Sequence, residues 1–157
     1  MYNYTTWQKL ADKAQCHPLF TLKEYIGAAD KSASMNLVHI TNANLDSDDF
    51  GSLQLDKSLV FVLETNEAHG MADQRAFFFK MEEMQLDVPV IVKRSYGKEH
   101  GPWTMDHGQE ETTLLQLYAS TDLGALLVDG FGDGIWIDAP DVDAACLLYT
   151  SPSPRDS

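Results

Sequence analysis

Basic residues are scarce in this chain, and their scarcity excludes several kinds of partner. The 157 residues include 11 lysines and arginines against 24 aspartates and glutamates, which gives a formal net charge of -13 at pH 7. A surface of this sign repels the phosphate backbone of nucleic acids and the headgroups of anionic membranes. We therefore expect neither nucleic acid nor a membrane among its partners.

Cysteine is also rare, and long apolar runs are missing. Cys16 and Cys146 are too few for a disulfide framework or a cysteine-rich metal site. No apolar run approaches the roughly 20 residues that span a bilayer. The opening MYNYTTWQKLADK lacks the basic-then-apolar order of a signal peptide. We expect a cytoplasmic protein, and its 44% hydrophobic content suffices for one modest core.

The two ends of the sequence raise questions about where the native domain begins and ends. The tail CLLYTSPSPRDS, residues 146–157, follows an acidic segment without a turn, a cap or any periodicity. It is similar to a translated transposase adapter from a sequencing library; the alternative is a disordered Ser/Pro-rich terminus. Met1 is either a start or an internal methionine, because TTWQKLADKAQ already has a helical pattern. We expect residues 1–145 to be an incomplete domain of a larger protein and residues 146–157 to be non-native.

Helical patterns recur along the chain. TLKEYIGAADKS has helical spacing, with Thr21 and Glu24 placed to form a capping box. A short helix is expected after Asp46 or Ser47. Residues 72–85 predict a longer helix, and EETTLLQLYAST predicts another. The longer helix carries four apolar side chains on or near one stripe: Phe77, Phe78, Met81 and Met84.

Four strands are predicted in alternation with these helices. They are MNLVHIT (35–41), SLVFVLE (58–64), VPVIVKR (88–94) and GALLVDG (124–130). Continuous apolar strands are buried on both faces, and helical crossovers join parallel neighbours. The predicted fold class is therefore α/β, a parallel sheet built from βα repeats. The pattern leaves open whether the sheet is open or a partial TIM-barrel-like arc, since a full barrel needs about eight such units.

Polar side chains follow several of the predicted strands. Parallel α/β folds gather their working groups at the carboxyl ends of the strands. A lysine–arginine pair there could hold a phosphate or carboxylate, and carboxylates could act as acid, base or Mg²⁺ ligands. The alternative is that these charges pair with one another. The residues concerned are His39, Thr41, Glu64, Lys93, Arg94 and Asp129.

Two further segments resemble ligand sites but have simpler interpretations. The connection from Ser95 to Gly108 carries four potential ligands without a diagnostic spacing, so solvated side chains are favoured over zinc. These are Glu99, His100, Asp106 and His107. His69 is interpreted as a loop or cap residue. In DGFGDG (129–134) an apolar IWI follows instead of a helix, so the glycines are expected to form tight turns between two strands rather than a dinucleotide loop.

Three stretches together carry a resemblance to a known family. They are VFVLETNEAHGMADQRAFFF (60–79), VPVIVKRSY (88–96) and LQLYASTDLGALLVDGFGDGIWIDAP (115–140). They resemble the three-domain form of 4-hydroxy-3-methylbut-2-enyl diphosphate synthase, an enzyme of non-mevalonate isoprenoid biosynthesis. The similarity extends from about His17 to Ala145 and matches the domain inserted between the catalytic barrel and the cluster-binding domain. The last stretch is also similar to the final strands of the catalytic barrel.

The resemblance implies an activity for the parent protein and a supporting role for this piece. The family reductively converts methylerythritol cyclodiphosphate to hydroxymethylbutenyl diphosphate, taking electrons from flavodoxin or ferredoxin through a 4Fe–4S cluster. In the family the cluster is held by cysteines and a glutamate in and beyond a CPSCGRTLFDLQ-like segment, and basic residues of the preceding barrel hold the diphosphate. Neither region matches this sequence, so no catalytic, cofactor-binding or metal-ligating residue is carried over, Cys146 included. Lys93 and Arg94 match the inserted domain, which implies a structural spacer.

Two alternatives from other classes stay open at this point. One is an independent barrel-type enzyme that uses Glu64, Lys93, Arg94 and Asp129 on a phosphorylated substrate. The other is a stand-alone α/β binding module.

Overall fold

A curled parallel sheet forms the centre of the molecule. The computed structural model describes residues 1–65, 67, 70–96 and 108–139, with the side chains of residues 108–114 left out. Six strands lie side by side in chain order, and every neighbouring pair is parallel. They are β1 (Tyr2–Asn3), β2 (Pro18–Thr21), β3 (Asn36–Ile40), β4 (Leu59–Glu64), β5 (Val90–Ser95) and β6 (Gly134–Asp138). The predicted α/β class with a parallel sheet is confirmed.

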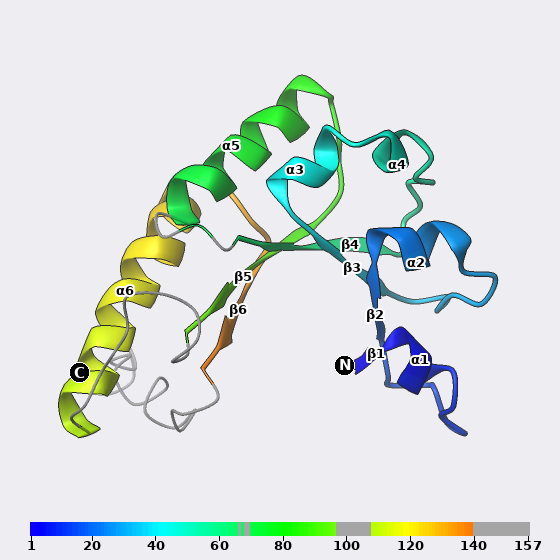
Figure 1. Ribbon diagram of the computed structural model, residues 1–157, viewed down its shortest axis with the longest axis horizontal. Helices are drawn as coiled ribbons and strands as arrows, with labels where there is room; N and C mark the ends of the chain where they lie inside the picture. Colours follow the sequence, from blue (N-terminus) through cyan, green and yellow to red (C-terminus); the bar gives the residue numbers. More distant parts are fainter. Residues whose placement is uncertain (66, 68–69, 97–107, 140–157) are drawn as a thin grey trace, which may run out of the picture.

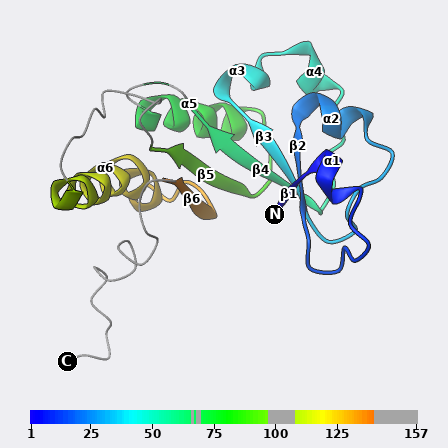
Figure 2. The same cartoon turned by 60° about the horizontal axis from the view of Figure 1, so that its bottom comes forward.

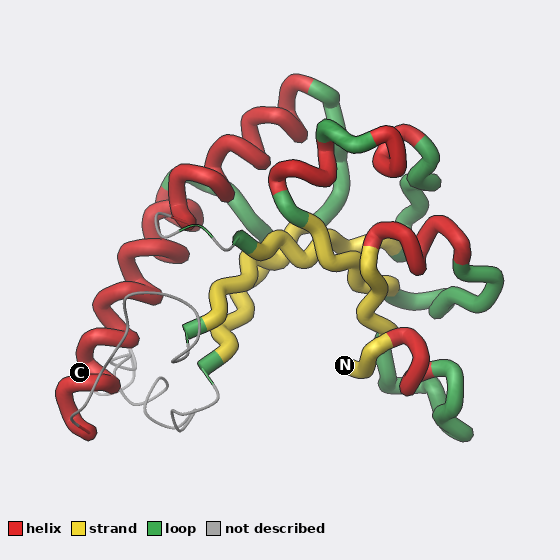
Figure 3. The backbone as a smooth tube through the Cα atoms, viewed as in Figure 1, coloured by secondary structure: helices red, strands yellow, loops and turns green. Residues whose placement is uncertain are grey.

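The helices lie along the outer, convex side of the curled sheet, as in part of a TIM barrel (Figures 1 and 3). They are α1 (Tyr4–Trp7), α2 (Leu22–Gly27), α3 (Asn42–Leu45), α4 (Asp48–Gly51), α5 (Gly70–Glu83) and α6 (Gly108–Val128). The strands form an arch, and α5 and α6 run side by side along one of its flanks (Figures 1 and 2). The partial-barrel alternative is therefore the correct one.

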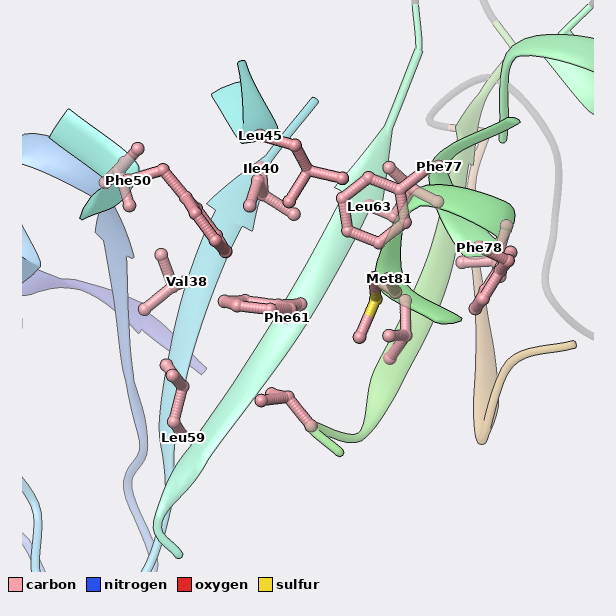
Figure 4. Close-up of a cluster of buried hydrophobic side chains, with 14 of the residues drawn as sticks. Val38, Ile40, Leu45, Phe50, Leu59, Phe61, Leu63, Phe77, Phe78 and Met81 are labelled. Carbon is pink, nitrogen blue, oxygen red and sulfur yellow. The ribbon is translucent and has the colours of Figure 1, made fainter. Parts of the chain in front are cut away.

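The main core fills the space between the convex face of the sheet and the helices. In-register residues of neighbouring parallel strands share a face, so Ile40, Leu63 and Val92 form one row across β3, β4 and β5. All three are 0% exposed. From α5, Phe77 and Met81 pack onto this face beside Phe61 (Figure 4). The apolar stripe of α5 thus attaches the helix to the strands.

The capping prediction for α2 is confirmed, and the stripe prediction for α5 is correct in part. The Thr21 amide donates to Glu24 Oε2 at 2.8 Å, and the Glu24 amide donates to Thr21 Oγ1 at 3.3 Å. Ser47 is the N-cap residue of α4, although its hydroxyl donates to the Asn44 carbonyl instead. Met84 lies beyond the end of α5 and is 46% exposed, so it does not extend the buried stripe.

The predicted strand over residues 124–130 is wrong. Gly124–Val128 are the last turns of α6, and the strand is β6, which begins at Gly134. Leu123 and Leu126 point into the core at helical spacing, with 2% and 0% exposure. Alanine and leucine favour helix and β-branched residues are few in this run, so it prolongs the preceding helix.

The beginning of the chain also differs from expectation. The predicted helix TTWQKLADKAQ is reduced to α1, four residues long, and the short strands β1 and β2 flank it. Trp7 is buried, and its indole Nε1 donates to the Cys16 carbonyl at 2.8 Å. This contact folds the chain back towards β2, so tertiary packing overrides the local helical pattern.

The glycine-rich segment forms a turn, as predicted. The turn connects helix α6 to strand β6, however, and not two strands. Gly130 and Gly132 have φ angles of 82° and 85°, a conformation that residues with a Cβ rarely adopt. A Cβ on Gly132 would also lie 2.9 Å from a Val92 methyl. The segment therefore reverses the chain from α6 into β6 and is not a phosphate loop.

Among the described helices, none combines the length and apolar character that crossing a bilayer requires.

Candidate functional site

A polar cluster lies on the inner, concave face of the sheet, at the carboxyl ends of β3, β4 and β5. Glu64 and Lys93 are in register on neighbouring strands. Each follows a core residue of the outer face, so alternation along the strand turns both to the inner face. Glu64 Oε1 lies 3.0 Å from Lys93 Nζ and accepts a hydrogen bond from Ser95 Oγ at 2.8 Å. Its other oxygen contacts His39 Nε2. We call these four residues the inner cluster.

The environment of Glu64 strongly favours its ionised form. The hydrogen bond with His39 is the largest of the effects that lower the pKa of Glu64 to about 2, with further contributions from Ser95 and Lys93 that together outweigh burial. The Glu64 side chain is 17% exposed and that of Lys93 14%. A carboxylate held in this way is an orienting group for its neighbours and a poor proton donor near neutral pH.

The positive charge of Lys93 is compensated by neighbouring carboxylates. Besides Glu64, its ammonium lies 3.8 Å from Asp138 Oδ2 and 4.9 Å from the centre of the Trp136 ring on β6. An ammonium between two carboxylates offers little net charge to an incoming anion. For Glu64 and Lys93, the alternative that strand-end charges pair with one another is therefore the correct one.

Arg94 lies on the opposite face of the sheet from its neighbour Lys93. Its Nε and Nη2 lie 3.1 and 3.0 Å from Asp122 Oδ2 on α6. Its Nη1 donates to the backbone carbonyls of Thr65 and Glu67, in the segment after β4, at 3.4 and 3.3 Å. Arg94 is 7% exposed. We call Arg94, Asp122 and Tyr96, whose hydroxyl donates to Asp122 Oδ2 at 3.3 Å, the outer cluster.

The outer cluster is closed to larger groups. A Cβ on Gly70, the first residue of α5, would lie 2.1 Å from Arg94 Nη1. The guanidinium therefore fits between the start of α5, the segment after β4 and α6. Burial raises the pKa of Tyr96 to about 12, helped by the charge of Asp122. Among the described residues, this arrangement joins three elements and leaves no room for a further group between the guanidinium and the start of α5.

Two other predicted strand-end residues lie elsewhere. Asp129 follows α6 and forms an ion pair with Arg75 on α5, because the segment before it is a helix and not a strand. Its assignment to the carboxyl-end group is therefore wrong. The Thr41 amide and hydroxyl both donate to Asn44 Oδ1, at 2.8 and 3.0 Å, which fixes the start of α3. Only His39, Glu64 and Lys93 of the predicted set come together.

Some predicted residues lie outside the described part of the chain, namely His69, the four candidate ligands between residues 99 and 107, and Cys146. Among the residues that are described, no group of three His, Cys, Asp or Glu side chains could hold a metal ion.

Sequence reasoning missed five members or partners of these clusters: Ser95, Tyr96, Asp122, Trp136 and Asp138. Ser95 continues the period of two that Lys93 begins, and this signal was available. Trp136 and Asp138 were missed because a strand was predicted at residues 124–130, so the IWI segment after the glycines was not recognised as the neighbour of β5. Asp122 carries no local signal, because its role depends on α6 lying beside Arg94.

Comparison with known proteins gives two relatives of the same name. The chain is 29% identical over 126 residues to the 4-hydroxy-3-methylbut-2-en-1-yl diphosphate synthase (flavodoxin) of Parabacteroides distasonis, covering 80% of this chain and 19% of the relative. It is 36% identical over 76 residues to the protein of that name from Protochlamydia amoebophila, covering 48% of this chain and 9% of the relative. The resemblance to this synthase family drawn from the sequence is thereby confirmed. No family model and no solved structure matches the chain.

Proposed function

We propose that this chain is part of a larger 4-hydroxy-3-methylbut-2-en-1-yl diphosphate synthase, and that residues 1–145 form an incomplete inserted domain that acts as a structural spacer. Residues 146–157 are then a non-native tail. The similarity to the Parabacteroides distasonis synthase over 80% of the chain carries the proposal. The chain spans only 19% of that relative's length, which leaves ample room for a catalytic region elsewhere.

The activity of the parent follows from the family as part of the same proposal. It is an oxidoreductase that converts the cyclic diphosphate substrate to hydroxymethylbutenyl diphosphate in the cytoplasm, with flavodoxin or ferredoxin as electron donor and a 4Fe–4S cluster as cofactor. The residues of this chain do not fit that cluster. Ligation needs several thiolates, whereas the chain has two cysteines, and Cys16, the one within the described residues, is a free cysteine after α1. Cluster ligation therefore belongs to another part of the protein.

The geometry of the two clusters supports a spacer over an independent enzyme. A phosphate-binding site built on Lys93 and Arg94 would need both cations on one face, but they lie on opposite faces with separate acidic partners. Asp129 is paired with Arg75, away from both. These ion pairs connect strands and helices to one another. Such contacts stabilise the fold and are consistent with a structural role.

The gene itself provides the first test. Extending the sequence downstream of the codon for Ala145 should show a CPxCGRTLF-like segment within about 30 codons, the spacing expected from the family resemblance. A stop codon directly after Ala145 would contradict the assignment. A native continuation of CLLYTSPSPRDS would contradict the interpretation of the tail but leave the family assignment standing.

Reconstitution of the isolated chain tests the division of labour. After anaerobic incubation with iron and sulfide, we expect a colourless protein without bound iron, because the necessary thiolates are missing. A Cys16→Ser variant should behave identically. If the unsubstituted chain turned brown and bound stoichiometric iron and sulfide, and Cys16→Ser did not, this piece would carry cluster chemistry. That result would overturn the spacer role.

A further inference from the structure

Helix α6 has an unusual surface for a helix on the outside of a sheet. Between Leu115 and Val128 its single charged residue is Asp122, which is turned inward to Arg94. The whole chain is 22% charged. On α5, the neighbouring helix, five of 14 residues are charged, namely Asp73, Arg75, Lys80, Glu82 and Glu83. A helix that faces water normally carries such charges, so α6 has the composition of a covered helix.

The outward side of this helix presents a regular stripe. Leu117, Thr121, Gly124 and Val128 are spaced by four, three and four residues, which places them on one side of the helix. Leu117 is 59% exposed and Val128 is 88% exposed. The inward side carries Leu115, Ala119, Leu123 and Leu126, all buried. The outward stripe therefore carries no charge and exposes a large apolar side chain at each end.

The polar atoms of the stripe are already satisfied. The Thr121 hydroxyl donates to the Leu117 carbonyl one turn earlier, at 2.8 Å, so its methyl group is the part available to a partner. Gly124 has open space where a Cβ would stand, with nothing within 4 Å. A large residue at each end with small residues between them is a shape into which another helix can pack closely.

The last strand of the described sheet, β6, also exposes an apolar side chain on the face that is otherwise buried. Ile135 of β6 continues the in-register row of Ile40, Leu63 and Val92. The other three are 0% exposed, whereas Ile135 is 49% exposed. β6 is the last strand of the six-stranded order, and it follows α6 directly through the turn at Gly130 and Gly132 (Figure 2). Exposed apolar side chains therefore occur both on α6 and on the last strand of the described sheet.

We propose that the outward stripe of α6 is a docking face for an apolar-striped helix from the remainder of the longer protein, an inference that rests on the proposed function. The length of the relatives supplies such a partner, since 81% of the Parabacteroides distasonis synthase (100% less the 19% covered) lies outside the match. Attachment to the same chain supplies a high effective concentration. A second copy of this piece is disfavoured, because two bodies of charge -13 repel one another.

Hydrogen exchange in the isolated chain and in the full-length protein encoded by the gene tests this proposal. We expect amides of residues 115–128 to exchange at least about tenfold more slowly in the full-length protein. Val128→Glu and Leu117→Glu should remove that difference, because a carboxylate on the stripe cannot be buried unpaired. Met84→Glu is the matched control, a change of the same kind at a residue 46% exposed beyond α5, and it should leave the difference intact.

Three results would overturn the proposal: equal exchange rates in both proteins, equal effects of Val128→Glu and Met84→Glu, or a discrete dimer of the isolated chain that Val128→Glu dissociates. The dimer would assign the stripe to a second copy. Iron content and synthase activity of the full-length protein are measured separately. If those are absent while the slowed exchange remains, the synthase assignment fails and the docking face stands.

Discussion

The inner and outer clusters lie at the same end of the sheet, and their cations are neighbours in sequence, but they are built differently. Lys93 and Glu64 link adjacent strands side chain to side chain and keep partial contact with solvent. Arg94 is almost fully buried and bridges a helix carboxylate and two backbone carbonyls. We expect the inner cluster to rehydrate more readily after the loss of one member, because the Arg94 side chain is 8% exposed against 14% for Lys93 and also binds two backbone carbonyls. Burial and the type of partner, more than charge, decide how much each cluster contributes to the fold.

Replacing Arg94 should have the largest effect and would show that the outer cluster dominates. Arg94→Met keeps the aliphatic part of the side chain but removes the guanidinium, which leaves Asp122 without its cation and the carbonyls of Thr65 and Glu67 without that donor. We expect a loss of about 3–5 kcal/mol in the free energy of unfolding, the range for breaking a buried ion pair. Urea denaturation measures it. Lys93→Met is the matched control and should cost less; equal losses would remove the distinction between the clusters.

Gly70→Ala tests the same cluster from its other side. The added methyl group would lie 2.1 Å from Arg94 Nη1, so either the guanidinium or the start of α5 must move. A loss of about 1–3 kcal/mol is expected from such overpacking. Gly27→Ala provides a control, because nothing lies within 4 Å of a Cβ there. In the Arg94→Met background the cost of Gly70→Ala should shrink, and an unchanged cost would show that Arg94 is not the obstacle.

Strand β5 illustrates which structural features can be predicted from the sequence and which cannot. The apolar run predicted the strand, and the period of two implied that Lys93 and Arg94 face opposite sides, yet their strand-end position suggested a joint site. The partner of Arg94 comes from α6, whose last turns were taken for a strand. Local pattern thus located the βα units from β3 to β5. Long-range partners, and the choice between helix and strand for GALLV, depend on packing that no short window contains.

Titration of Glu64 should produce a smaller and reversible effect on the inner cluster. Its folded-state pKa of about 2 lies below the ordinary value of 4.5, so its contribution is present above about pH 4.5 and is lost as the pH falls towards 2. Glu64→Gln removes this contribution, at a cost of about 1–3 kcal/mol at pH 7. Denaturation curves of the parent and the variant should converge as the pH approaches 2. Glu83→Gln, on the exposed end of α5, serves as control; a constant gap between parent and Glu64→Gln would exclude a titrating Glu64.

The smallest effect is expected for Asp129, which belongs to neither cluster. Its side chain is 40% exposed and that of its partner Arg75 is 34% exposed. Water and salt screen such a pair, and exposed ion pairs contribute about 0–1 kcal/mol. Asp129→Asn should therefore change the free energy of unfolding by less than about 1 kcal/mol, and by still less in high salt. Because the sequence had grouped Asp129 with Glu64, Lys93 and Arg94, a loss comparable to that of Arg94→Met would restore that grouping. A small loss would confirm that charge at the surface and charge within the fold contribute on different scales.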